Sequence, residues 1–303
     1  MGRIVGAAVA LVAVVVAALG IWIYQQISTL EVAKVTDDVH VIYGMGSNVG
    51  VLRTDEGSVV VDTMTFTTQG RGIRERAESL AGPVRALVNT HYHLDHTHGN
   101  PAFSAGQDVY ASTRTRAYLD ALDADYWSGE AAETLPGELV DGERTLRLGG
   151  KTIRMLDVGR GHTDGDLVVL FVEDRVVHTG DLFFNGRYPN IDLEAGGSVR
   201  DWSATIDRIL SLEFDRVIPG HGPVTDAEGL RSFQRFIEQL AATGREAERA
   251  GWSLDETLAN AKLDADEGYE VMAIPLVMRL DRDFVIRRAW EEATGSFERV
   301  VVE

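Results

Sequence analysis

The residues with the clearest chemical potential form a histidine cluster in the first third of the chain. Positions 90–96 read Thr-His-Tyr-His-Leu-Asp-His, so three imidazoles and one carboxylate occupy six consecutive residues. These groups must be desolvated together, and a divalent cation is the simplest partner that compensates all of them. The alternative, a solvated polar loop, is disfavoured by this density. We therefore interpret the segment as part of a metal site.

Three further glycine-rich segments each follow an apolar stretch and each carry one more candidate ligand. They are Gly161-His162-Thr163, Thr179-Gly180-Asp181 and Pro219-Gly220-His221-Gly222. Glycine lets a loop turn sharply and lets the backbone approach a ligand closely. We expect the histidine or aspartate at each loop tip to point toward a common edge of the fold. Because the chain has no cysteine, nitrogen and oxygen atoms must hold any metal.

Taken together, these segments resemble the metallo-β-lactamase superfamily, whose pattern His-x-His-x-Asp-His, then His, Asp and His, is complete and in order here. The resemblance covers roughly residues 35–235. It implies an αββα sandwich, four layers in which two mixed β-sheets carry the metals at one edge. It also implies the ligand sets: His91, His93 and His162 on one zinc ion, Asp95, His96 and His221 on the second, and Asp181 bridging both.

Two zinc ions per chain, held in this way, imply hydrolytic chemistry. The metals would lower the pKa of a bound water toward ~7 and supply hydroxide for attack on a carbonyl. One ion would polarise the carbonyl oxygen while the other stabilises the leaving group. Asp95 is the expected catalytic residue, because it could orient the nucleophile and relay its proton. Iron and manganese suit the same donor atoms and stay open as alternatives.

The expected substrate is a small molecule with an ester, thioester, lactone or lactam-type carbonyl. Relatives that open β-lactams with a cysteine on the second zinc carry that thiolate where this chain has Asp181, and a chain without cysteine cannot belong to that group. Two alternatives stay open: a phosphodiesterase of the same family, and a non-catalytic metal-stabilised module serving a membrane partner. The net charge of −18 argues against nucleic acid as a partner, and the oligomeric state is left open.

Several residues near these motifs allow two interpretations. The loop at residues 183–190 either lines the substrate entrance or only connects elements. Tyr126 and Trp127 either cover the metals or close the core beneath a helix. His98 and His178 are expected not to be ligands. Three other side chains are candidates for orienting the imidazoles: Thr163, Asp166 and Thr179.

The apolar pattern predicts the elements that must position these loops. Strands are expected at 39–43, 47–53, 58–62, 84–89, 108–111 and 217–218, and hairpins at 145–158 and 167–178. Helices are expected at 71–80, 113–127, 200–212, 227–248, 253–261 and 282–293. Strands and helices do not alternate strictly, which disfavours a doubly wound parallel sheet. Two mixed sheets packed face to face, with helices outside, fit this order better.

The N-terminal segment Ile4–Ile23 contains no charged or strongly polar residue and is long enough to cross the ~30 Å hydrocarbon layer. We interpret it as a transmembrane helix. A cleaved secretory signal is the alternative, because Ala18-Leu19-Gly20 loosely resembles a cleavage site. Arg3 precedes the segment and only Lys34 follows closely, so the positive-inside rule places the N-terminus in the cytoplasm.

The chain is therefore expected to have two parts. Residues 1–30 would form a single-pass membrane anchor, and residues 31–303 would form one extracytoplasmic catalytic domain. The last part of that domain, from about residue 227 to 303, is expected to be a helical extension. Hydrophobic residues make up 45% of the chain, which is ordinary for a protein that buries a core.

Overall fold

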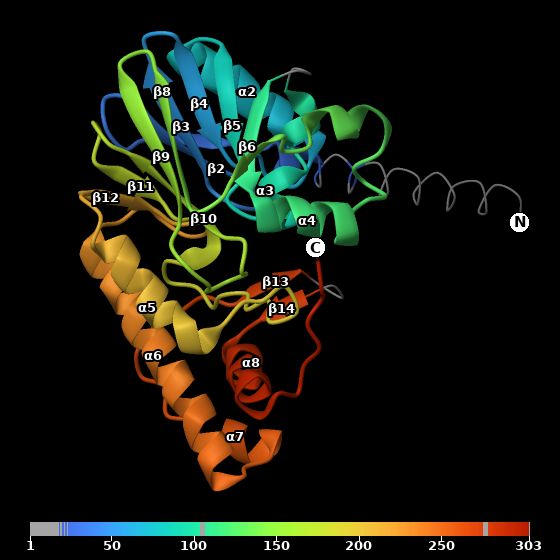
Figure 1. Ribbon diagram of the computed structural model, residues 1–303, viewed down its shortest axis with the longest axis vertical. Coiled ribbons are helices and arrows are strands. Elements are labelled where there is room, and N and C mark those ends of the chain that lie inside the picture. Colours follow the sequence, from blue (N-terminus) through green and yellow to red (C-terminus); the bar gives the residue numbers. More distant parts are fainter. Residues whose placement is uncertain are drawn as a thin grey trace, which may run out of the picture.

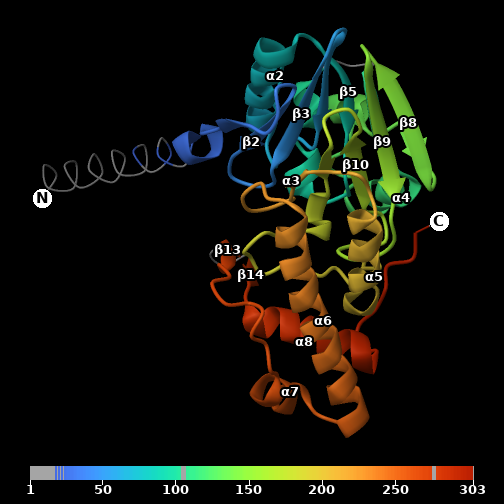
Figure 2. The same ribbon diagram turned by 90° about the vertical axis from the view of Figure 1, so that its left-hand side faces the viewer.

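The computed structural model describes residues 18, 20, 22, 24–103, 107–274 and 278–302, and its central feature is a pair of mixed β-sheets between helices (Figure 1). Helix α2 (Thr67–Ala81) covers the outer face of one sheet. Helices α5 (Val199–Leu210) and α6 (Ala227–Ala250) pack on the other sheet and extend below the sandwich, away from α2 (Figure 2). The prediction of two mixed sheets with helices outside is confirmed.

The predicted transmembrane segment Ile4–Ile23 lies outside the described residues, apart from Ala18, Gly20 and Trp22. Within the part of the chain that the structure describes, no helix combines the length and the apolar character needed to cross a bilayer. The anchor and the extracytoplasmic location of the catalytic domain stay predictions from the sequence.

The first sheet has seven strands that follow one another in chain order. They are β1 (Glu31–Lys34), β2 (Val39–Tyr43), β3 (Val49–Thr54), β4 (Gly57–Val61), β5 (Val84–Val88), β6 (Asp108–Ser112) and β7 (Glu138–Val140). The strands from β1 to β4 pair antiparallel, and those from β4 to β7 pair parallel. Every residue of β4 is buried, because α2 covers one face and the second sheet covers the other.

The second sheet has five strands in the order β12-β11-β10-β9-β8. They are β8 (Glu143–Leu148), β9 (Lys151–Asp157), β10 (Leu167–Phe171), β11 (Val176–His178) and β12 (Arg216–Ile218). All pair antiparallel except β11 with β12. The β8–β9 turn uses Gly149 and Gly150, both at positive φ, as the predicted hairpin requires.

Three apolar clusters hold the layers together. Valines of β2 and β4 meet Val169 and Phe171 of β10 between the two sheets. Ile73 of α2 packs on the outer face of the first sheet, and Trp202 of α5 packs on that of the second. Trp202 is fully buried, and its indole Nε1 donates a hydrogen bond to the carbonyl of Leu182, 3.0 Å away. The packing of α5 therefore also fixes the loop that carries Asp181.

The C-terminal part adds helices and a small hairpin. Helix α6 begins after Asp226, whose carboxylate accepts hydrogen bonds from the first-turn amides, and ends before the left-handed Gly251. The elements α7 (Leu254–Asn260), β13 (Met272–Ile274), β14 (Met278–Leu280) and α8 (Arg282–Thr294) follow. Both views place the β13–β14 hairpin between the sandwich and α8 (Figures 1 and 2).

The structure differs from the expected elements in two main places. The sequence analysis missed the short strands β1, β7, β13 and β14. The helix predicted at 113–127 ends early, as α4 (Thr113–Leu122). Its predicted last turn is replaced by a turn in which the Asp123 carboxylate accepts hydrogen bonds from the ring nitrogens of His98 and Trp127. Side-chain bonding of this kind competes with helix continuation.

Replacing Trp202 with Phe should lower the free energy of unfolding by about 1–3 kcal/mol, because the buried carbonyl of Leu182 loses its donor. Urea unfolding followed by circular dichroism measures this loss. Trp290→Phe is the matched control, since the Trp290 indole also donates to a backbone carbonyl, that of Trp252, but at a half-buried site that water can reach. Equal losses in the two variants would contradict the prediction.

Candidate metal centre

The seven predicted ligands come from loops at the ends of strands in both sheets. The histidine cluster follows β5 and includes one helical turn, α3 (Leu94–Thr97). His162 lies between β9 and β10, Asp181 lies in a 3₁₀ turn directly after β11, and His221 lies shortly after β12. The strand ends of the two sheets meet at one edge, so residues as far apart as 91 and 221 are brought together there. All seven belong to two adjoining groups.

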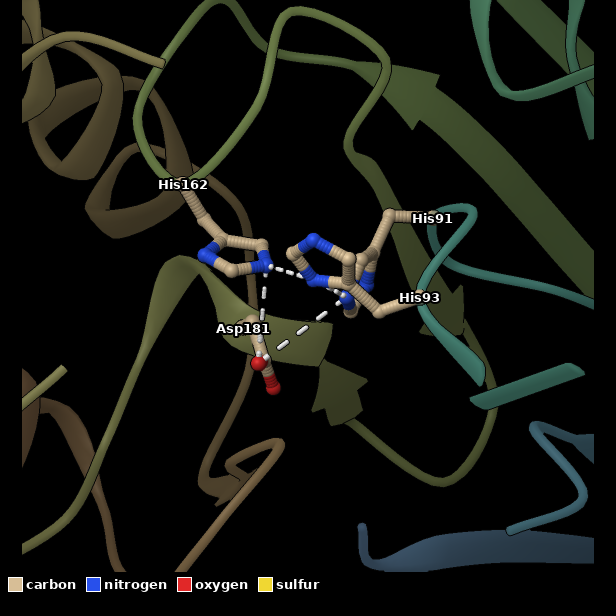
Figure 3. A group of neighbouring side chains, drawn as sticks. All are labelled: His91, His93, His162 and Asp181. Atoms are coloured by element: carbon tan, nitrogen blue, oxygen red, sulfur yellow. Dashed lines mark hydrogen bonds and ion pairs between the residues drawn. The ribbon is translucent and has the colours of Figure 1, made fainter. Parts of the chain in front are cut away.

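The first group contains three imidazoles and one carboxylate oxygen that face one another (Figure 3). His93 Nδ1 lies 3.2 Å from His91 Nε2 and 2.8 Å from His162 Nε2. Asp181 Oδ2 lies 3.9 Å from His91 Nε2 and 3.6 Å from His162 Nε2. A cation among these atoms would contact three nitrogens and one oxygen, the donors that zinc favours in a chain without cysteine.

The second group contains Asp95, His96 and His221. Asp95 Oδ2 lies 3.4 Å from His221 Nε2 and 3.8 Å from His96 Nε2. Asp181 Oδ1 lies 3.2 Å from His96 Nε2 and 3.4 Å from His221 Nε2. Asp181 therefore presents Oδ2 to the first group and Oδ1 to the second.

A buried aspartate that the sequence analysis missed orients His96. Asp62 Oδ2 lies 2.7 Å from His96 Nδ1 and accepts the hydroxyl of Thr90 at 2.8 Å, while Oδ1 accepts the Thr90 amide at 2.8 Å. Asp62 is fully buried, so these hydrogen bonds replace the hydration of its side chain. With Nδ1 of His96 held by Asp62, Nε2 is the ring nitrogen that faces Asp95 and Asp181.

His93 and His162 are oriented from outside in the same way. His93 Nε2 lies 2.9 Å from Asp192 Oδ2, which also accepts the hydroxyl of Tyr92 at 2.5 Å. The Nδ1 atom of His162 donates to the carbonyl of Asn190 at 2.9 Å. In both rings the outward nitrogen is occupied, so the inward nitrogen is free to act as a ligand.

The three side chains proposed from the sequence to orient the imidazoles contact none of them directly. Asp166 accepts hydrogen bonds from the amide and hydroxyl of Thr163, at 2.9 and 2.6 Å. The Thr179 hydroxyl donates to backbone carbonyls. These residues shape the loops that carry His162 and Asp181, so any effect on the imidazoles is transmitted through the backbone.

Burial and the charges of neighbouring side chains set the protonation of His91, His162 and Asp181. Burial lowers the pKa of His162 to about 4 and holds the pKa of His91 well below its ordinary value. Burial alone would raise the pKa of Asp181, but the imidazoles of His221 and His96 hold it well below its usual range. At neutral pH His91 and His162 are therefore neutral and Asp181 is ionised, the protonation states that metal ligation requires.

Two buried atoms between the groups show that these residues fit a cation. Among the described residues, His96 Nε2 and Asp181 Oδ1 have no hydrogen-bond partner, although both are inaccessible to solvent. An unsatisfied buried polar atom costs about 1–3 kcal/mol, and native proteins rarely keep one without a reason. A cation between them would satisfy both atoms at once.

The backbone at Gly220 packs directly against the shared carboxylate. A Cβ atom at this position would lie 2.0 Å from Asp181 Oδ1, closer than any van der Waals contact allows. Only glycine lets the chain pass here. This close approach explains the glycine that precedes His221 in the sequence.

Several other candidates lie away from the two groups. The His98 ring stacks on Tyr126 with centroids 3.6 Å apart, and its Nε2 lies 2.7 Å from Asp123 Oδ2. Trp127 is buried and donates to the same carboxylate. Tyr126 and Trp127 therefore close the core beside α4 and do not line the cavity at the candidate ligands. His178 is buried in β11 and belongs to neither group.

A cavity of about 230 Å³ opens onto the candidate ligands. Four of them contribute to its wall: His93, Asp95, Asp181 and His221. The remaining lining residues are Leu94, Phe184, Asn190, Met272, Ile274, Met278 and Leu280. Only Phe184 and Asn190 of the 183–190 loop line the cavity, whereas Phe183 packs in the core.

Comparison with known protein families identifies the family to which a chain with this geometry belongs. The family model of the metallo-beta-lactamase superfamily matches residues 42–221, which include all seven candidate ligands. The chain belongs to the metallo-beta-lactamase superfamily. This membership confirms the prediction of a metal-dependent hydrolase. The match ends close to the start of α6, so the elements from Ala227 onward lie beyond it.

Two curated relatives and one solved structure illustrate the similarity. The alpha subunit of 2,4-dinitroanisole O-demethylase from Nocardioides sp. (strain JS1661) is 25% identical over 213 residues, 68% of this chain but only 63% of that protein. A type 2 metallo-beta-lactamase from Bacillus sp. (strain 170) is 25% identical over 215 residues, 67% of this chain and 80% of that protein. The metallo-beta-lactamase from Pontibacter korlensis shares the fold, with a TM-score of 0.60 and 23% identity over 69% of this chain and 99% of that one.

The Asp192→Ala variant should bind metal about 10–100-fold more weakly, because His93 loses the carboxylate that fixes its ring. Competition with a chromophoric chelator measures the affinity. Asp123→Ala is the matched control, since it removes a carboxylate from His98, which lies outside both groups. A loss of affinity of similar size in the control would show that the effect is not specific to the metal centre.

Proposed function

We propose that the protein is a dinuclear zinc hydrolase acting on an ester, thioester, lactone or lactam-type carbonyl. The position of Asp181 carries this proposal, because its two oxygens face two separate groups of imidazoles at 3.2–3.9 Å. Two zinc ions held there would supply an activated water nucleophile and Lewis-acid polarisation of the carbonyl.

The number and placement of the donors favour catalysis over a purely structural site. One closed tetrahedral set of four ligands suffices for a structural zinc ion. This chain instead brings seven donors together in two adjoining groups, and four of the seven residues border a cavity. An accessible cavity at the ligands gives a substrate a place to bind, which a non-catalytic module does not need.

Asp95 is placed where it can accept a proton from the attacking water. Its side chain is 27% exposed, whereas His96 and Asp181 are almost completely buried, and it lines the cavity. It can therefore hold the attacking water in position and accept its proton. His221, on the other side of Asp95, is kept in place by Phe184, whose ring stacks on the imidazole with centroids 5.0 Å apart.

The relatives' names do not point to one substrate. They describe the O-demethylation of an aryl ether and a β-lactamase, reactions that cleave different bonds. Among the described residues, the wall of the cavity outside the candidate ligands consists mainly of apolar side chains and contains no lysine or arginine. A phosphodiester would therefore meet cations only at the proposed metal positions. An uncharged carbonyl compound suits the site better.

Metal removal tests the proposal directly. Purified protein should contain about two zinc ions per chain by mass spectrometric metal analysis, and EDTA should abolish hydrolysis of p-nitrophenyl acetate. Added zinc should restore it. Iron or manganese in the purified protein would correct the metal, and full activity in metal-free protein would refute the proposed mechanism.

Asp181→Ala should reduce the metal content from two ions to one or fewer, because both groups lose an oxygen ligand. The value of kcat/KM should fall on the order of 10²-fold or more. His98→Ala is the control, as it removes an imidazole only seven residues from His91 that contacts neither group. If Asp181→Ala keeps two tightly bound ions, the bridging assignment is wrong.

A further inference from the structure

One wall of the cavity comes from the C-terminal part of the chain, beyond the region that matches the family. Strands β13 and β14 pair antiparallel, with Met272 opposite Leu280 and Ile274 opposite Met278. Side chains of cross-strand pairs two residues apart point to the same face of a hairpin. All four of these apolar side chains line the cavity, so one face of the hairpin is turned toward the candidate ligands.

This wall carries no positive charge among the described residues. The arginines of the hairpin and of the adjoining segments are paired with carboxylates: Arg187 with Glu270 at 3.6 Å, Arg279 with Asp281 at 2.5 Å and Arg282 with Asp266 at 2.8 Å. The acidic groups in the cavity wall are Asp95 and Asp181. An anionic group held beside the hairpin would lose its hydration and would find no lysine or arginine in this wall, which is costly.

Two apolar side chains of the hairpin are exposed and can contact an apolar ligand in the cavity. Ile274 is 51% exposed and Met278 is 40% exposed, although both side chains border the cavity. The hairpin is held beside the site through Glu270, two residues before β13, because the amide of Glu270 donates to the carbonyl of Gly186 at 2.8 Å. Adaptable methionine side chains next to a reaction site suit an apolar ligand of variable shape.

We propose that the β13–β14 hairpin makes the site selective for uncharged substrates with a short apolar chain next to the scissile carbonyl. This inference rests on the proposed hydrolase function. The cavity of about 230 Å³ is smaller than the ~300–1,000 Å³ of pockets for drug-sized ligands, so the chain that it accepts is short. Each methylene that enters it should raise kcat/KM by about fourfold until the cavity is full.

Two esters with the same leaving group test the charge preference. In mono-p-nitrophenyl succinate the acyl chain ends in a carboxylate, and in p-nitrophenyl 4-methylpentanoate an isopropyl group of similar shape replaces it. The zinc-loaded full chain should hydrolyse the 4-methylpentanoate with a kcat/KM at least about tenfold higher. Equal rates on the two esters would overturn the inference.

A lysine placed on the hairpin should change this preference. Met278→Lys should shift the ratio of the two kcat/KM values toward the succinate by about tenfold, because the ammonium group can then pair with the carboxylate. Val271→Lys is the matched control: Val271 directly precedes β13, is 44% exposed and does not line the cavity. The control should leave the ratio within about twofold. An equal shift in both variants would show that general charge, and not the hairpin wall, sets the preference.

Binding without turnover separates this inference from the proposed function. The amide N-(4-nitrophenyl)-4-methylpentanamide should bind the full chain, as measured by calorimetry, and Met278→Lys should weaken binding while Val271→Lys should not. If the zinc-loaded protein hydrolyses neither ester, the proposed function fails, and these binding data alone decide whether the hairpin selects apolar ligands. Unchanged binding in Met278→Lys would overturn its role.

Discussion

The site depends on one buried carboxylate that is shared between two groups of imidazoles. Asp181 is only 4% exposed, and its two oxygens lie within 4 Å of four histidines. Such an anion is tolerated in the interior only where positive charge compensates it. The surrounding fold is arranged to keep it in place: Gly220 gives it space, and the indole of Trp202 holds the adjacent carbonyl of Leu182. Any displacement of this carboxylate would therefore affect both candidate cation positions together.

The elements beyond the sandwich support the centre from outside. Asn190 and Asp192, which orient His162 and His93, belong to a loop that helix α8 secures. The guanidinium of Arg288 in α8 donates to the carbonyl of Ile191 at 2.8 Å, and the hydroxyl of Ser198 donates to Glu292 at 2.6 Å. The C-terminal part thus contributes twice, through contacts behind the first ligand group and through the apolar wall of the cavity.

The sequence was most informative about features that are set by residues close together in the chain. The β-branched strands predicted the two mixed sheets, which the structure confirms. The histidines, the aspartates and the glycines beside them predicted the seven candidate ligands, which the structure brings together in two groups. It was least informative about partners that are distant in the chain. Asp192 lies 99 residues from His93, and no local pattern links them. Asp62 ends a predicted strand, yet only folding brings its carboxylate to His96. The strands β13 and β14 have three residues each, too few for a period-two pattern to be distinguished from a loop.

The reaction and its selectivity are encoded in different parts of the chain. The family match spans residues 42–221 and contains every candidate ligand, whereas the hairpin begins at Met272. Ligand positions are constrained by mutual distances of a few ångströms, so they tolerate little change. The side chains of Ile274 and Met278 have no such constraint, because half-exposed apolar residues can be exchanged at small cost to the fold. A substrate preference can therefore change in the C-terminal part without disturbing the metal centre, as expected when function is built from sites placed on a common fold.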